Sequence, residues 1–111
     1  MIERTVLEYL QSHTGISCYL EIPLNPPGRF IVIEKTGSTT ENCITSSTIA
    51  VQSYGKKLAE AIETNKLVKK AMSGMTELDE IGGCHLNSDY NFKDTSTKKY
   101  RYQAVFDITH Y

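Results

Sequence analysis

The sequence predicts a single α+β domain, with the element order α-β-β-β-α-β-β and a mainly antiparallel sheet that has its helices packed on one face. Three observations lead to this fold class. The 111 residues have room for one hydrophobic core only. Two segments repeat apolar residues at helical spacing, and the last third alternates apolar with polar residues, as half-solvated strands do. We therefore expect one domain over residues 1–111.

The first third of the chain is expected to form one helix and two strands. Residues 2–12 predict a short amphipathic helix that ends near Gly15. Its apolar stripe consists of Ile2, Val6, Tyr9 and Leu10. Residues 16–22 are predicted to form a strand, which a Pro-rich loop stops. Residues 30–35 are apolar on both pleat faces and predict a central strand, after which residues 37–42 are expected to turn the chain.

The middle of the chain predicts a third strand and then the main helix. Residues 43–53 form the strand, and its polar first half is expected at an edge or in solvent. Its buried part is limited to Ile49, Ala50 and Val51. Over residues 54–75 the apolar spacing changes to three or four, which predicts one helix or two. Ser53 is a candidate N-cap, and Thr64 with Asn65 is a candidate interruption, because short polar side chains compete for backbone hydrogen bonds.

The last third has the clearest alternation in the sequence. Residues 84–92 and 100–109 each place apolar side chains on one face and polar side chains on the other. Two such strands joined by a polar loop are expected to pair antiparallel. The register that stacks the apolar residues pairs Phe92 with Tyr100, Tyr90 with Tyr102, and Leu86 with Phe106.

Charge and hydropathy exclude several classes of protein. The charges nearly cancel, 12 basic against 13 acidic residues, so no overall field attracts the chain to nucleic acid or to an anionic membrane. No apolar run approaches the roughly 20 residues that span a bilayer, and Glu3 with Arg4 stands where a signal peptide would be apolar. We expect a protein that is cytosolic at synthesis. Its cysteines, Cys18, Cys43 and Cys84, form no CxxC pair and are expected to be buried, reduced thiols.

The residues that usually carry chemistry do not converge in this sequence. The three histidines, His13, His85 and His110, are far apart, whereas a metal site needs three or four converging ligands. His85 is expected beside Asp107 across the hairpin, as an ordinary surface contact. It points away from its neighbour Cys84, because adjacent strand residues face opposite ways, so it cannot activate that thiol. With no phosphate-loop, dinucleotide, zinc-protease or nucleophile-elbow motif present, we expect no enzyme, no metal and no cofactor.

Three loops are candidates for contacts with partners, because loops on a rigid scaffold often carry binding residues. They are the Pro-rich loop, the polar segment 37–42 and the basic loop between the last two strands. For the first two, ordinary connections are an equally good interpretation. The candidate contact residues are Pro26, Pro27, Arg29, Thr39, Thr40, Lys93, Lys98 and Lys99.

A local excess of lysine gives an alternative function. Residues 54–72 hold Glu60 and Glu63 against five lysines, which are Lys56, Lys57, Lys66, Lys69 and Lys70. With the α-β-β-β-α order, this pattern also looks like a double-stranded-RNA-binding domain, although the Gly-Pro-His type of loop is missing and an aromatic hairpin is added. A solvated helix face explains the lysines without a ligand. A small nucleic-acid-binding module that uses the lysine face of the main helix is the alternative.

Three stretches of the chain resemble a known group of proteins. They are residues 47–55 (Ser-Thr-Ile-Ala-Val-Gln-Ser-Tyr-Gly), the helix positions Ala59, Ala61, Asn65, Val68, Ala71 and Met72, and residues 99–109 (Lys-Tyr-Arg-Tyr-Gln-Ala-Val-Phe-Asp-Ile-Thr). The chain is similar to small minor structural proteins of tailed phages and prophages of Gram-positive bacteria, in particular the tail terminator (tail completion, head-tail joining) group.

This resemblance implies a protein of the virion tail or neck, present in the host cytoplasm during assembly. Such proteins form a homo-oligomeric ring, typically a hexamer, on the finished tail tube. The ring ends tube growth and offers a surface to the head connector, so the implied partners are the major tail tube protein and a head-completion or connector protein. DNA passes through the lumen without specific binding, and neither catalysis nor a membrane is involved. The sheet tends to face the lumen, which fits a neutral to acidic polar face on the hairpin: His85, Asn87, Asp89, Gln103 and Asp107.

Overall fold

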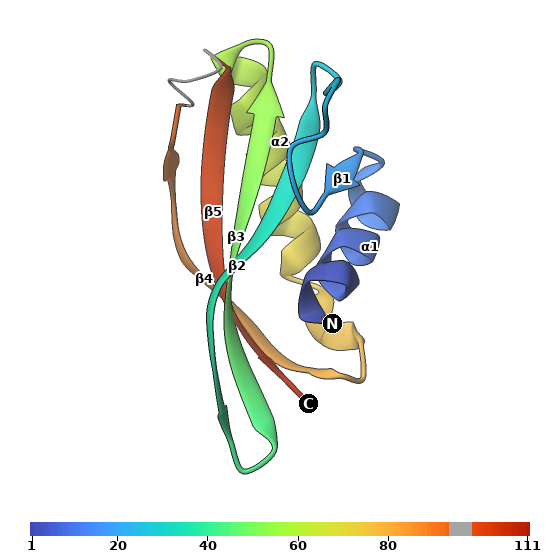
Figure 1. Ribbon diagram of the computed structural model, residues 1–111, viewed down its shortest axis with the longest axis vertical. Helices are drawn as coiled ribbons and strands as arrows, with labels where there is room; N and C mark the ends of the chain where they lie inside the picture. Colours follow the sequence, from blue (N-terminus) through green and yellow to red (C-terminus); the bar gives the residue numbers. More distant parts are fainter. Residues whose placement is uncertain (94–98) are drawn as a thin grey trace.

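A computed structural model describes residues 1–93 and 99–111 and confirms the predicted α+β fold class and element order (Figure 1). The elements are α1 (Ile2–Thr14), β1 (Cys18–Tyr19), β2 (Phe30–Glu41), β3 (Ile44–Gly55), α2 (Leu58–Met72), the 3₁₀ turn η1 (Met75–Glu77), β4 (Ile81–Asn91) and β5 (Tyr100–His110). No helix in the described ranges is long and apolar enough to cross a membrane.

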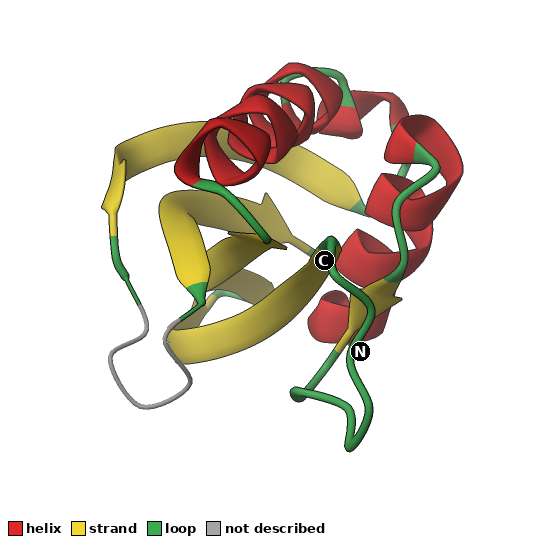
Figure 2. Cartoon of the chain, turned by 90° about the horizontal axis from the view of Figure 1, so that it is seen from above, coloured by secondary structure: helices red, strands yellow, loops and turns green. Residues whose placement is uncertain are grey.

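The strands form one sheet in the order β1-β2-β3-β5-β4. All neighbouring strands pair antiparallel except β1 with β2. Strand β3 lies at the centre and is paired along its whole length, with β2 on one side and β5 on the other. The sheet is strongly curved, and the β2–β3 hairpin extends beyond the helices at one end of a molecule 43 Å long (Figures 1 and 2).

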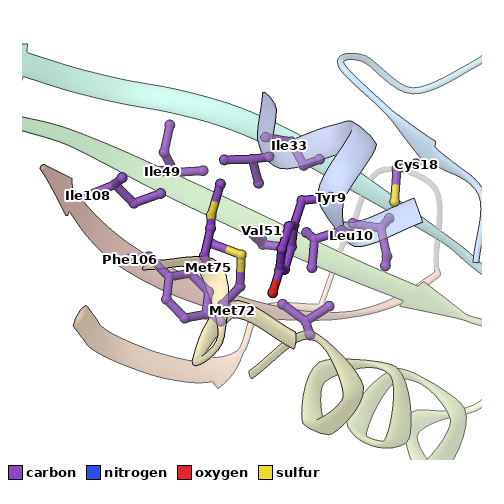
Figure 3. Packing of buried hydrophobic residues seen from close by; sticks show 14 of the residues in the cluster. Tyr9, Leu10, Cys18, Ile33, Ile49, Val51, Met72, Met75, Phe106 and Ile108 are labelled. Atoms are coloured by element: carbon purple, nitrogen blue, oxygen red, sulfur yellow. The ribbon is translucent and has the colours of Figure 1, made fainter. Parts of the chain in front are cut away.

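The main core lies between one face of this sheet and the two helices (Figures 2 and 3). The predicted α1 stripe is buried here, as are three apolar residues of the region predicted as the main helix: Val68, Met72 and Met75. Ala61 of the same region is also completely buried. Alternate residues of β2, β3 and β5 complete the layer, among them Ile33, Val51 and Phe106. The opposite sheet face has only a small cluster, in which the rings of Phe30 and Tyr54 stack 4.5 Å apart.

The β2–β3 hairpin corrects the predicted turn at residues 37–42. These residues continue β2 as far as Glu41, and the turn is only Asn42 and Cys43, with φ values of 52° and 65°. Two residues with positive φ form the tight turn whose twist matches a hairpin, and asparagine tolerates this conformation well. The β-branched threonines before the turn favour the strand. Candidate contact residues Thr39 and Thr40 are therefore strand residues, not loop residues.

The boundary between β3 and α2 also differs from the prediction. Strand β3 continues through Tyr54 to Gly55, because Tyr54 pairs with Phe30 and Arg101 on its two neighbours and stacks on the Phe30 ring. Helix α2 therefore begins at Leu58, with Lys57 at the N-cap position predicted for Ser53.

Helix α2 is not interrupted at its two buried polar residues. Thr64 donates its hydroxyl hydrogen to the Glu60 carbonyl oxygen one turn earlier, and Asn65 donates from its amide nitrogen to Asp89. Thr64 thus bonds to a carbonyl group of its own helix and Asn65 to a neighbouring strand, and the helix continues past both residues. The strand predicted at residues 16–22 shortens to Cys18–Tyr19, because only these two residues find partners on β2.

The last hairpin has the predicted register in its first half only. Leu86 pairs with Phe106 as predicted, but an irregularity between Leu86 and Ser88 shifts the pairing by one residue. Tyr90 therefore lies opposite Gln103 instead of Tyr102. An extra residue in one strand exchanges the two faces for all residues beyond it. The expected apolar face is consequently divided between the two sides of the sheet.

The core predicts a clear difference between two leucines. Leu10 is completely buried, whereas Leu67 on α2 is 38% exposed. Leu10→Ala should lower the free energy of unfolding by about 2–5 kcal/mol, because it removes apolar contacts and leaves a cavity. The matched control Leu67→Ala should cost less than about 1 kcal/mol. Denaturant unfolding followed by circular dichroism measures both values, and equal losses would contradict this assignment of the core.

Candidate functional site

Four of the five predicted lumen residues share the sheet face that points away from the helices. His85 pairs opposite Asp107, and Asn87 donates to the Asp107 carboxylate at 2.9 Å. Gln103 accepts a hydrogen bond from Gln52 at 3.0 Å and donates to the Tyr90 hydroxyl at 2.6 Å. The polar groups of this face are thus largely bonded to one another.

The fifth residue, Asp89, lies on the helix side because of the irregularity in β4. Its Oδ2 accepts hydrogen bonds from Lys69 Nζ at 2.9 Å and from Asn65 Nδ2 at 3.1 Å. The hydrogen bond from Lys69 is the main reason that the pKa of Asp89 lies below its ordinary value of 3.8, and partial burial opposes this effect. Asp89 therefore fastens β4 to α2 and does not share a face with the other four residues.

A basic end of the molecule forms where the β3–α2 turn meets the start of β5; we define it by Lys56, Lys57, Lys99 and Arg101. Gly55 pairs with Tyr100, so the register brings Lys56 and Lys99 to the same place. An open cavity of about 510 Å³ lies there, lined by Pro26, Gly28, Gly55, Lys56 and Lys99.

Aromatic rings hold two cations of the basic end in place. The Lys99 ammonium lies 5.3 Å from the centre of the Phe30 ring. The Arg101 guanidinium lies 4.1 Å from the Phe92 ring centre, and it donates hydrogen bonds to the Phe92 carbonyl oxygen and to the Tyr54 hydroxyl. Such contacts limit the rotamers of a cation without neutralising its charge.

An acidic end lies beyond the other end of α2; we define it by Glu8, Glu77, Asp79 and Glu80. Three of these residues line an open cavity of about 300 Å³, and all four are exposed. Two bases border it. His13 Nε2 lies 3.5 Å from Glu77 Oε1, and Lys70 lines a neighbouring pocket with Glu77. Negative charge therefore remains in excess at this end.

The candidate contact residues are distributed over three places. Pro26 and Lys99 come together in the basic cavity. Arg29 turns to α2, where it donates to Thr64 Oγ1 at 2.7 Å and lies 3.5 Å from Glu63. Thr40 bonds to Thr45 across the hairpin. Of the others, Pro27 and Lys93 are exposed at the basic side of the molecule, and Lys98 lies outside the described residues.

The five lysines of residues 54–72 do not form one helix face. Lys56 and Lys57 precede α2, Lys69 is bonded to Asp89, and Lys66 and Lys70 are exposed on the helix. The sequence groups Arg101 with Lys93, Lys98 and Lys99 as basic residues that face a partner, but sequence reasoning did not bring this group together with Lys56 and Lys57. The available signal was the alternation of bases with aromatic residues from Lys99 to Tyr102, which is typical of cations held by rings.

The cysteines are free thiols, but their expected burial is wrong for Cys43, which is exposed in the hairpin turn. Burial raises the pKa of Cys18 to about 12 and that of Cys84 to about 11, so both remain protonated at neutral pH. His110 contacts the Ser47 hydroxyl at 2.8 Å, and burial lowers its pKa. Within the described ranges, no three His, Cys, Asp or Glu side chains converge on a metal-sized point.

The fold of this chain is similar to that of a chain in a known virion structure. No protein-family model matches the sequence, and no curated protein matches it. Among solved structures, a chain from the "Virion of native gene transfer agent (GTA) particle" has a similar fold, with a TM-score of 0.59 at 11% sequence identity. The similarity covers 95% of this chain and 90% of that chain. The two proteins therefore share their architecture over nearly their whole length.

The Asp89–Lys69 contact predicts a specific pH dependence of stability. A carboxyl whose pKa is lowered by folding stabilises the fold above its ordinary pKa of 3.8, and this contribution is lost as the pH falls further, through the folded-state value. Asp89→Asn should therefore cost about 1 kcal/mol at neutral pH and have little effect in strong acid. The control is Asp107→Asn, whose carboxylate contacts only uncharged side chains in the described structure. Urea unfolding across the acid range tests this, and an equal, pH-independent loss in both variants would contradict it.

Proposed function

We propose that this protein is a structural component of a phage-like virion, and more specifically a tail terminator. In this role, copies form a ring, typically a hexamer, on the end of the tail tube, stop its growth and present a surface to the head connector. The observation that carries the proposal is the chain-wide likeness to a protein of a gene transfer agent virion. The resemblance of the sequence to tail terminators supports the same role.

The distribution of polar groups supports a docking role without catalysis. Among the open cavities of the described surface, the acidic one is lined by Ser12, His13 and Glu77. Ser12 donates its hydroxyl hydrogen to the Tyr9 carbonyl oxygen, and His13 Nδ1, the ring nitrogen next to Ser12, lies 2.8 Å from the same oxygen. A contact with a carbonyl oxygen needs the proton on Nδ1, so this nitrogen is not placed to act as a base toward Ser12. The thiols of Cys18 and Cys84 are protonated at neutral pH because of their raised pKa values. We therefore propose a protein that acts through its contacts and not through a reaction.

The sheet face that carries His85, Asn87, Gln103 and Asp107 suits the wall of a lumen. Its polar side chains hydrogen-bond to one another, which leaves few groups that would hold a passing polymer. Asp107 adds negative charge, and retention of DNA by its phosphates needs basic groups. Arg101 lies on the same face of β5 but at its other end, where it donates hydrogen bonds to the Phe92 carbonyl oxygen and the Tyr54 hydroxyl. Asp89 takes no part in this wall, since it binds Lys69 on the other face.

Electron microscopy of tail tubes tests the terminator role. The protein is mixed with its polymerising tail-tube subunit, and negative stain should reveal rings at tube ends and shorter tubes than in a control without the protein. Leu67→Ala, a surface variant that should keep its fold, is the positive control and should form rings and shorten tubes like the wild type. Bare ends and unchanged tube lengths would overturn the terminator role.

A duplex titration separates this function from nucleic-acid binding. Because Lys69 is neutralised by Asp89 and the protein has a net charge of −1, we expect no binding of duplex RNA or DNA even at low salt. Fluorescence anisotropy measures this for the protein and for Lys56→Glu with Lys57→Glu. Binding that weakens steeply with salt and disappears in the double variant would favour the nucleic-acid module instead.

A further inference from the structure

The two ends of α2 lie beside surfaces of opposite charge. The basic end is next to its first turn, and the acidic end follows its last turn, close to the N-terminus of the chain (Figure 1). Fifteen residues of α-helix separate them, which is about 22 Å. The near-zero net charge of the protein is thus the sum of two separate surfaces.

Stabilisation of the helix does not explain this arrangement. The helix dipole favours acidic groups near the N-terminus and basic groups near the C-terminus. Glu60, in the first turn, satisfies this preference, because its carboxylate accepts the backbone N–H of Lys56. Lys56 and Lys57 at the start, and Glu77 beyond the end, have the opposite arrangement. The helix dipole therefore does not account for these three charges, although Lys69 and Lys70 in the last turn do fit it.

Neighbouring groups limit the freedom of three cations at the basic end. Lys99 and Arg101 are held against aromatic rings, and the aliphatic part of Lys56 lies against Gly28. None of these three cations forms an ion pair with a carboxylate in the described part of the chain. Cations that are already ordered lose little freedom when an anion arrives.

We propose that the acidic end of a second copy of this chain docks on the basic end of the first. The argument for this occupant is charge complementarity: the same molecule carries, at the other end of α2, exposed carboxylates of Glu77, Asp79 and Glu80 beside an open cavity. The contact joins two different surfaces, so it leaves one of each free and propagates from copy to copy. It deepens the proposed ring and rests on that function.

Charges at such a contact determine orientation and partner choice more than total affinity. They act within about 10 Å at moderate salt, so the contact should weaken as salt is added. A duplex nucleic acid is a poorer fit, because the cations gather at one end of the molecule, where Lys56 and Lys99 line a single cavity, and do not follow an extended groove.

Charge reversal tests the contact with two complementary variants. The first is Lys56→Glu with Lys99→Glu at the basic end, and the second is Glu77→Lys with Glu80→Lys at the acidic end. Sedimentation velocity at low salt should reveal self-association of the wild-type protein and an association constant at least about tenfold lower for each variant alone. An equimolar mixture of the two variants should associate again, because each reversed end then meets a reversed partner.

The matched control is Lys35→Glu with Lys66→Glu, which makes the same charge change at two exposed lysines outside both ends. It should associate like the wild type. Circular dichroism checks that every variant is folded, and Lys56→Gln with Lys99→Gln replaces the reversed pair if that variant is not.

Three results would overturn the inference: a wild-type protein that stays monomeric at low salt, a control that fails like the variants, or a mixture that does not recover. The tube assay keeps this failure separate from that of the proposed function. If both reversed variants still cap tail tubes, the contact between copies is wrong and the terminator role stands. If the wild type leaves the tubes bare, the terminator role itself is wrong.

Discussion

Two helices of 13 and 15 residues can cover only one face of a five-stranded sheet, and this limit determines the rest of the molecule. On the covered face, α1 and α2 exclude water from a continuous apolar layer. The other face is covered only by side chains of the strands themselves. It has a small aromatic cluster at one end, formed around Phe30 and Tyr54, and hydrogen-bonded glutamines further along. Buried amides without such partners would cost stability, so the Gln52–Gln103–Tyr90 chain is part of the fold as well as of its surface.

The same limit explains why cations gather beside the uncovered cluster. Phe30 and Tyr54 have no helix above them, and the ring faces that a core would cover are available to long basic side chains. Lys and Arg can cover apolar surface with their stems while their charged groups stay in water. Lys99 and Arg101 do this at the start of β5, and the pairing of Gly55 with Tyr100 adds Lys56. The basic end thus follows from an incomplete second core.

Predictions from the sequence are correct where the structure follows a local pattern of residues. They fail where a contact with a distant residue overrides that pattern. The apolar stripe of α1, the buried face of α2 and the pairing of Leu86 with Phe106 follow from spacing alone. Tyr54 fits helical spacing equally well, and only the Phe30 ring on a neighbouring strand keeps it in β3. Thr64 and Asn65 resemble a helix break until Arg29 and Asp89 provide partners for them. The irregularity after Leu86 has no sequence signal that we can identify, yet it moves Asp89 to the other face.

The candidate site is less predictable than the fold, because it depends on charges that are neighbours only in the sheet. Lys56 and Lys99 are far apart in the sequence but line the same cavity. Conversely, the lysines of residues 54–72 are close in the sequence but separated in space, and Lys69 among them forms an ion pair with Asp89. The strand register thus produces a protein with a basic end and an acidic end. Two identical surfaces that attract each other form a closed pair, whereas unlike surfaces leave a free end after each addition. Such a chain closes into a ring only if the rotation between neighbours divides a full turn. A template such as a tube end would select that rotation. A weak, charge-directed contact between copies is then sufficient for ring assembly on a tail, whereas in free solution the same weak contact gives little assembly.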